Sequence, residues 1–326
     1  MAWEHSTIPG HKNNVSCVLF DGKSGSLISN SEDKTLKVWN FETKAQLQTQ
    51  KRETDRYWML RLTKNNNLLA AGHDSGFEIW ELNKDTLTPH GLVGSDLLIF
   101  AQGMKTFLYD IEKNVQKEEL YQYVPKDKNA VAYIGRIVVN KFDPSLFMVE
   151  IFENDERTFM IKKKEAYLNF PNVARQYDAI DSCFISKIQT AILVSPTEIH
   201  LQKASGDDKK QILRLSDKMQ ILRLFSSTNE NELIIATLDS VLKYDLKGGK
   251  VLGQAEVEKG ADIRNVVMTK NNIALCGKHI LIITNQDLEV ICTVQEKFSI
   301  RSAFWERDNL LFYTTKNHWK YAMLNG

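Results

Sequence analysis

The sequence has few of the features that mark membrane, secreted or nucleic-acid-binding proteins. No window approaches the run of about 18 apolar residues that a membrane-spanning helix needs. The first residues contain no basic stretch followed by an apolar one, so no secretory signal is visible. With 42 basic against 41 acidic side chains, the chain has no net attraction for nucleic acid or for an anionic membrane surface. We therefore expect a structured cytosolic protein with no nucleic-acid partner.

Cysteine and proline are also scarce. Six prolines and 16 glycines in 326 residues exclude a collagen-like or proline-rich chain. The four cysteines share no C-x-x-C spacing and lie in apolar runs, which favours small buried side chains in a reducing compartment over zinc ligands or disulfides. They are Cys17, Cys183, Cys276 and Cys292.

A repeat is the most informative feature that the sequence does contain. Residues 10–40 and residues 56–82 each have apolar runs separated by polar turns, with a last run that ends near Trp. Asp33 and Asp74 are 41 positions apart, and so are Trp39 and Trp80. This spacing agrees with the ~40–45 residues of one four-stranded blade of a WD-repeat propeller.

The rest of the chain keeps this spacing of apolar runs, although the residue types differ from those of the first two units. Six further groups of three short apolar runs follow, so the 326 residues contain eight blade-like units of about 41 residues each. The fold class predicted is therefore an all-β propeller of about eight four-stranded blades. Residues 111–129 and 162–179 are charged, and we expect them to form exposed loops between blades.

Four residues of the first unit occupy the positions of the hydrogen-bonded tetrad of WD repeats. We expect Asp33 to accept a hydrogen bond from His11, and we expect Ser31 to link the imidazole to the indole N–H of Trp39. A buried N–H without a partner costs about 1–3 kcal/mol, so this chain of bonds predicts a structural role. A catalytic triad is disfavoured because no G-x-S-x-G elbow accompanies the serine.

Sequence motifs typical of nucleotide binding, metal binding or catalysis are missing. The sequence has no phosphate-binding G-x-x-x-x-G-K-[ST] loop and no G-x-G-x-x-G, and its His, Cys and carboxylate residues do not recur at metal-ligand spacing. The sequence therefore predicts no metal, no cofactor and no enzymatic activity.

The amino-acid sequence of the repeats resembles that of one protein family. The segments GHKNNVSC, ISNSEDKTLKVWN and AAGHDSGFEIWEL, with IALCGKHILIITN and YTTKNHWKYAML near the other end, are similar to the alpha subunit of coatomer, the COPI vesicle coat. The resemblance is sharpest over residues 10–82 and 262–323 and loose over residues 111–215.

This resemblance implies an internal fragment that spans parts of two tandem propellers. Residues 1–84 would be the last two blades of the first propeller, and residues 85–326 would be six blades of the second. The sequence leaves open whether the eight units close as one ring or form two open arcs, whose unpaired edges would invite aggregation.

The resemblance also implies a function. The chain would be a non-enzymatic coat scaffold and adaptor, in contact with other coatomer subunits and, through the coat, with an Arf-type GTPase. It would act in retrograde Golgi-to-ER and intra-Golgi transport, in the cytoplasm and peripherally on Golgi membranes and COPI vesicles. The family reads dilysine signals of cargo, and Arg56 lies where a basic residue would hold the end of the cargo peptide. Two alternatives stay open: another WD-repeat scaffold in membrane trafficking, and a propeller enzyme.

Overall fold

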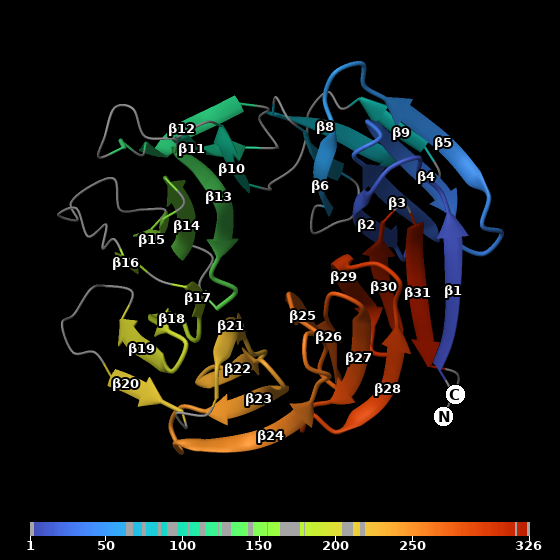
Figure 1. The fold of residues 1–326 in the computed structure, drawn as a ribbon. Coiled ribbons are helices and arrows are strands. Elements are labelled where there is room, and N and C mark those ends of the chain that lie inside the picture. The colour runs from blue at the N-terminus through green and yellow to red at the C-terminus, as the bar shows by residue number, and fades with distance from the viewer. Residues whose placement is uncertain are drawn as a thin grey trace.

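The computed structural model describes the chain as a set of β-strands (Figure 1). Within the residues described, every regular element is a strand, and no helix has the length and hydropathy needed to cross a bilayer. The described residues are 3–62, 68–73, 76–83, 86–89, 97–102, 105–110, 115–122, 124–125, 132–142, 146–154, 156–163, 177–178, 180–203, 211–215, 219–316 and 318–324.

The strands of the described residues form eight antiparallel sheets, which we call blades. The strands of each blade are given in their spatial order. The first blade contains β2 (Val15–Asp21), β3 (Ser26–Ser31), β4 (Thr35–Asn40) and β5 (Gln46–Lys51), and the second contains β6 (Tyr57–Leu62), β7 (Leu68–His73), β8 (Gly76–Asn83) and β9 (Thr86–Pro89). The third contains β10 (Leu97–Gln102), β11 (Lys105–Asp110) and β12 (Val115–Gln122), and the fourth contains β13 (Ala132–Val139), β14 (Leu146–Glu153), β15 (Glu156–Lys163) and β16 (Tyr177–Asp178).

The other four blades follow the same order. The fifth blade contains β17 (Asp181–Phe184), β18 (Gln189–Ser195), β19 (Glu198–Lys203) and β20 (Gln211–Arg214), and the sixth contains β21 (Ile221–Ser226), β22 (Glu232–Thr237), β23 (Ser240–Asp245) and β24 (Lys250–Glu256). The seventh contains β25 (Asn265–Met268), β26 (Asn272–Cys276), β27 (Ile280–Asn285) and β28 (Val290–Gln295), and the eighth contains β29 (Ile300–Arg307), β30 (Leu310–Thr315), β31 (His318–Leu324) and β1 (Trp3–Pro9).

The blades surround a central axis in one ring, with the first strand of each blade innermost (Figure 1). The ring is completed by β1, which pairs antiparallel with β31 from Trp3↔Leu324 to Pro9↔His318. The two ends of the chain thus share one blade, and β31 has a partner on both sides. The prediction of an all-β propeller is confirmed, and of its two forms the single ring is the one observed.

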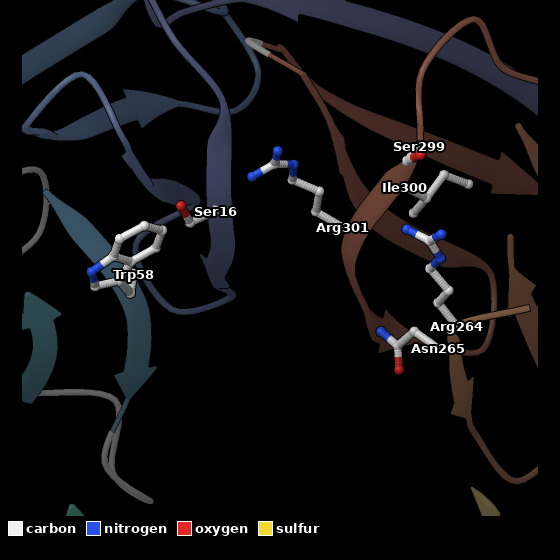
Figure 2. Close-up of a pocket in the computed structure, with 7 residues that line it drawn as sticks. All are labelled: Ser16, Trp58, Arg264, Asn265, Ser299, Ile300 and Arg301. Carbon is white, nitrogen blue, oxygen red and sulfur yellow. The ribbon is translucent and has the colours of Figure 1, made fainter. Parts of the chain in front are cut away.

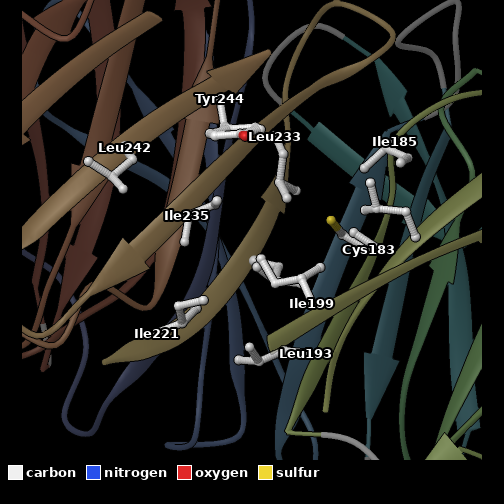
Figure 3. Close-up of a cluster of buried hydrophobic side chains, with 12 residues drawn as sticks. Cys183, Ile185, Leu193, Ile199, Ile221, Leu233, Ile235, Leu242 and Tyr244 are labelled. Atoms are coloured by element: carbon white, nitrogen blue, oxygen red, sulfur yellow. The ribbon is translucent and has the colours of Figure 1, made fainter. Parts of the chain in front are cut away.

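Apolar clusters between neighbouring blades hold the ring together. The middle strands β3 and β26 are buried along their whole length, whereas the outer strands β5 and β28 are mostly exposed. These two blades therefore pack on both faces and meet solvent at their outer strands. One such cluster joins the blades of β17–β20 and β21–β24, where Ile199 and Leu233 are fully buried (Figure 3). Complete burial of a side chain of this size contributes roughly 1.5–3 kcal/mol.

The charged segment 111–129 contains β12, so the prediction of a loop over that whole segment is wrong. β12 is the last strand in its described sheet, and a strand in that position can carry charged side chains because it is paired on one side only. The second blade continues past residue 84, since β9 pairs with β8. The division into residues 1–84 and 85–326 stays a prediction.

The four cysteines, which all lie in the described part of the chain, form no disulfide bond. Cys17, Cys183 and Cys276 are buried, and Cys292 is partly exposed. Burial raises the pKa of the Cys276 thiol to about 12, so this thiol stays protonated at neutral pH.

Candidate binding pocket on the ring axis

A chain of buried hydrogen bonds crosses the first blade. Nδ1 of His11 lies 3.2 Å from Oδ2 of Asp33, and Nε2 of His11 lies 2.8 Å from Oγ of Ser29. The indole Nε1 of Trp39 donates to the same Ser29 oxygen at 2.9 Å. Thr35 extends the chain, because its hydroxyl donates to Asp33 and lies 2.9 Å from Nδ1 of His11. His11, Asp33 and Trp39 are therefore brought together, through Ser29.

The prediction that Ser31 makes this link is wrong. Its hydroxyl donates to the backbone oxygen of Asn13 at 3.1 Å and accepts from the backbone N–H of Asp33 at 3.0 Å. Ser29 and Ser31 point to the same face of β3, but they are two residues and thus about 6.6 Å apart along the strand. Ser31 lies at the turn, too far along β3 to reach the indole, and Ser29 does so instead.

Electrostatics fix the protonation states in this chain. Burial lowers the pKa of His11, although Asp33 acts in the opposite direction. Burial alone would raise the pKa of Asp33, but hydrogen bonds from His11, Thr35 and the Lys12 backbone outweigh it and hold that pKa well below its usual range. The lowered pKa favours the neutral form of His11 at pH 7, and the tautomer that matches these contacts carries its proton on Nδ1, which faces the carboxylate. Ser29 can then donate to Nε2 while it accepts from the indole, so its oxygen is engaged on both sides.

The second blade has lost this arrangement. Nε1 of Trp80 is buried and has no hydrogen-bond partner in the described part of the chain. Ser29 pairs with the residue two before Trp39, and Ala71 pairs with the residue two before Trp80, so an alanine takes the place of the serine. Asp74, which the repeat spacing aligns with Asp33, lies outside the described residues.

The first strands of four consecutive blades line a pocket of about 440 Å³ on the inner side of the ring (Figure 2). We call this the axial pocket. Trp58 of β6 and Ile300 of β29 form its apolar part. Its polar lining consists of Ser16, Arg264, Asn265, Ser299 and Arg301. These residues lie at or just before the starts of β2, β6, β25 and β29, so they share one end of the ring axis.

Donor groups outnumber acceptors in the lining of the axial pocket. Arg301 donates from Nη1 to Glu32 at 2.6 Å, and Arg264 binds Oδ2 of Asp262 through Nε at 2.6 Å and Nη2 at 2.5 Å. Each arginine has five N–H donors, so each carboxylate uses only part of its arginine. The side chains of Arg264 and Arg301 are 47% and 42% exposed. The guanidinium of Arg301 extends towards Ser16, with Arg264 and Asn265 on the opposite side of the pocket (Figure 2).

Arg56 lies beside this pocket and not in its lining. It precedes β6 and is exposed, and its guanidinium carbon stands 4.5 Å from the ring centroid of Trp58. Arg264 occupies the equivalent position, directly before β25. That recurrence could have drawn attention to Arg264 from the sequence, whereas nothing in the sequence alone brings Arg301 and Ser16 together.

No metal centre is evident among the residues described: no three His, Cys, Asp or Glu side chains are grouped so that they could hold an ion.

Two family models match the chain. The model described as COPA/B second beta-propeller matches residues 101–326, and the WD domain, G-beta repeat, matches residues 3–40. Among curated proteins, the chain is 29% identical over 288 residues to coatomer subunit alpha-1 of Arabidopsis thaliana, covering 86% of this chain and 23% of the relative. It is 26% identical over 281 residues to coatomer subunit alpha of Saccharomyces cerevisiae, covering 85% of this chain and 22% of the relative. The chain thus spans about a quarter of the length of these relatives.

Solved structures share the fold. The computationally designed Ika8 protein superposes with a TM-score of 0.69 at 14% identity, and Saccharomyces cerevisiae Sqt1 with a TM-score of 0.67 at 10% identity. In both cases 98% of this chain and 98% of the other chain are covered.

Proposed function

Because the chain belongs to the COPA/B second beta-propeller family, we propose that it serves as a non-enzymatic scaffold of the COPI vesicle coat. The observation that carries this proposal is the similarity to coatomer alpha subunits from plants and yeast over about 86% of the chain. The partners proposed are the other coatomer subunits and, through the coat, an Arf-type GTPase. The place of action is the cytoplasmic side of Golgi membranes and COPI vesicles, reached through the complex.

The buried hydrogen bonds among His11, Ser29 and Trp39 in the first blade have a structural role, which supports the proposal that the protein is not an enzyme. The Ser29 oxygen is bound by the Trp39 indole and lies 2.8 Å from Nε2 of His11, so it is not available as a nucleophile. The division at residue 84 also remains part of the proposal: residues 1–84 would correspond to the last two blades of the family's first propeller and residues 85–326 to six blades of its second, although the eight blades of this chain share one ring (Figure 1). The separate matches of the WD model to residues 3–40 and of the second-propeller model to residues 101–326 support that division.

Co-purification tests the scaffold role. The tagged full chain, expressed in eukaryotic cells, should recover other coatomer subunits, as judged by mass spectrometry. Tagged Ika8 is a suitable control, since it shares the fold at 14% identity and should recover none of them. Recovery of a different trafficking assembly would favour the alternative of another WD-repeat scaffold. An equal yield of coatomer subunits from this chain and from Ika8 would contradict the proposed role in the COPI coat.

We further propose that the scaffold takes part in retrograde Golgi-to-ER and intra-Golgi transport and recognises dilysine signals of cargo, with Arg56 holding the peptide carboxylate. Its exposed guanidinium beside Trp58 on the ring axis supports this role. A charge-assisted hydrogen bond of this kind contributes roughly 1.5–3 kcal/mol. Arg56→Ala should therefore weaken the affinity for a dilysine peptide by about tenfold or more in a calorimetric titration.

Arg61→Ala is the matched control for Arg56→Ala. Arg61 is also exposed, but it lies near the other end of β6, and its Nη1 donates to the backbone oxygen of Leu60 at 2.8 Å. This control should bind the dilysine peptide as the unmodified chain does. If Arg56→Ala also binds with unchanged affinity, Arg56 has no part in the recognition.

A further inference from the structure

We propose that the axial pocket binds an extended acidic segment of a partner protein, whose carboxylates are held by Arg264 and Arg301 against the indole of Trp58. This goes beyond the recognition of a dilysine signal, which is a basic segment, and the two arginines that it invokes lie in other blades than Arg56. The volume of about 440 Å³ falls in the range of about 300–1,000 Å³ that is usual for ligand pockets.

The axial pocket offers more hydrogen-bond donors than acceptors. Two guanidinium groups and the Asn265 amide line the pocket and offer N–H groups to it. Guanidinium groups bind carboxylates with two parallel hydrogen bonds, which makes such pairs stronger and more directional than neutral hydrogen bonds. The existing partners, Glu32 and Asp262, occupy only part of this capacity.

The lining of the axial pocket also contains a buried hydroxyl group. Oγ of Ser16 is buried and has no hydrogen-bond partner within the described residues, and it belongs to the lining of the same pocket. A buried hydroxyl without a partner is unfavourable, so a ligand that accepts a hydrogen bond from it relieves this cost. The guanidinium of Arg301 extends towards Ser16, so one carboxylate near both groups would satisfy them together (Figure 2).

The indole of Trp58 gives the pocket an apolar surface that is open to a ligand. Trp58 is 43% exposed although it is a large aromatic side chain, and Met59 beside it is 38% exposed. A small inorganic anion gains nothing from the indole, whereas a peptide can place an apolar side chain against it. Polar anchors combined with an apolar wall therefore favour a peptide over a free anion.

The test is fluorescence anisotropy with the full chain and a labelled acidic peptide, Gly-Ser-Glu-Asp-Phe-Glu-Asp-Leu-Ser-Gly, amidated at its end so that it carries no terminal carboxylate. We expect binding that weakens as salt is raised, and no binding of the same peptide with Gln and Asn in place of Glu and Asp. The double variant Arg264→Gln/Arg301→Gln should lose about tenfold or more in affinity.

Arg307→Gln is the matched control, since Arg307 is exposed and lies at the far end of β29. It should bind the peptide as the unmodified chain does, and the melting temperature of each variant shows whether the fold is kept. Trp58→Ala should weaken the binding of the acidic peptide and leave the melting temperature of the protein nearly unchanged.

Three results would overturn the proposal: equal binding of the acidic peptide and its amide counterpart, unchanged affinity in the double arginine variant, or displacement of the peptide by inorganic phosphate at similar concentration, which would indicate a site for small anions. None of these results bears on the dilysine titration with Arg56→Ala, so the two proposals can fail separately.

Discussion

The hydroxyl of Ser29 is the point at which two buried ring systems meet, since it binds the Trp39 indole and the His11 imidazole. Ser29 is fully buried, so its removal leaves the Trp39 N–H without a partner and without water. We expect Ser29→Ala to lower the free energy of unfolding by about 1–3 kcal/mol, measured by urea denaturation.

Ser16→Ala provides the contrast on the neighbouring strand. The Ser16 hydroxyl is buried but makes no hydrogen bond with the described residues, so its removal should not lower the free energy of unfolding. An equal loss of stability in both variants would mean that the loss at Ser29 comes from packing and not from its hydrogen bonds.

The His11–Asp33 pair makes stability depend on pH in one direction. Burial lowers the pKa of His11 in the folded chain, while the unfolded chain has the ordinary value of about 6.5. Below that pH the unfolded state binds more protons, so the free energy of unfolding falls as the pH is lowered towards the folded pKa. The depressed pKa of Asp33 acts in the same sense at lower pH, because its contribution is present above its ordinary pKa and lost below it.

We therefore expect urea unfolding to give a lower stability at about pH 5.5 than at about pH 7.5, and His11→Gln to remove most of this difference. His318→Gln is the control, since burial also lowers the pKa of His318 but its side chain is only partly buried. A pH dependence that persists in His11→Gln and vanishes in His318→Gln would contradict the assignment.

The same residues show what a single sequence can predict at this scale. His11, Asp33 and Trp39 stand out because each has a distinctive side chain at a distinctive spacing. Ser29 and Ser31 lie on the same face of one strand, and only the position of the indole across the sheet distinguishes them. The axial pocket was not predictable, because its residues come from four blades that the folded ring brings together.

At the scale of elements, a close contact between neighbouring blades lies at Gly253 of β24. A Cβ at this position would overlap the backbone carbonyl oxygen of Asp287, which belongs to the turn between β27 and β28 of the next blade. Backbone cannot move aside as a side chain can, so Gly253→Ala should lower the free energy of unfolding by about 1–3 kcal/mol. Thermal or urea denaturation measures this.

Gly248→Ala is the control for Gly253→Ala. A Cβ there would meet the carboxylate of Asp245, the end of a flexible side chain that can rotate away. We expect a smaller loss of stability. Equal losses in the two variants would show that the carbonyl of Asp287 does not limit the approach of the two blades.

Strands and their order were largely predictable, because apolar runs of four to eight residues between turn residues recur with the period of a blade. β12 was the exception. Its sequence VQKEELYQ is dominated by polar and charged residues, and the pairing with β11 that makes it a strand is a tertiary contact.

At the scale of the whole molecule, stability depends on the pairing of β1 with β31, since without it the last blade would have three strands and an open edge. Deletion of residues 1–9 removes seven paired residues, from Trp3↔Leu324 to Pro9↔His318. The deleted chain should melt more than about 5 °C below the full chain and should associate, as seen by size-exclusion chromatography. A synthetic peptide of residues 1–9 added in trans should restore both properties by occupying the edge of β31, and a peptide of the same composition in scrambled order should not. If the deleted chain melts with the full chain and stays monomeric, the ring does not need β1 to close, and its cohesion comes from the apolar clusters between blades.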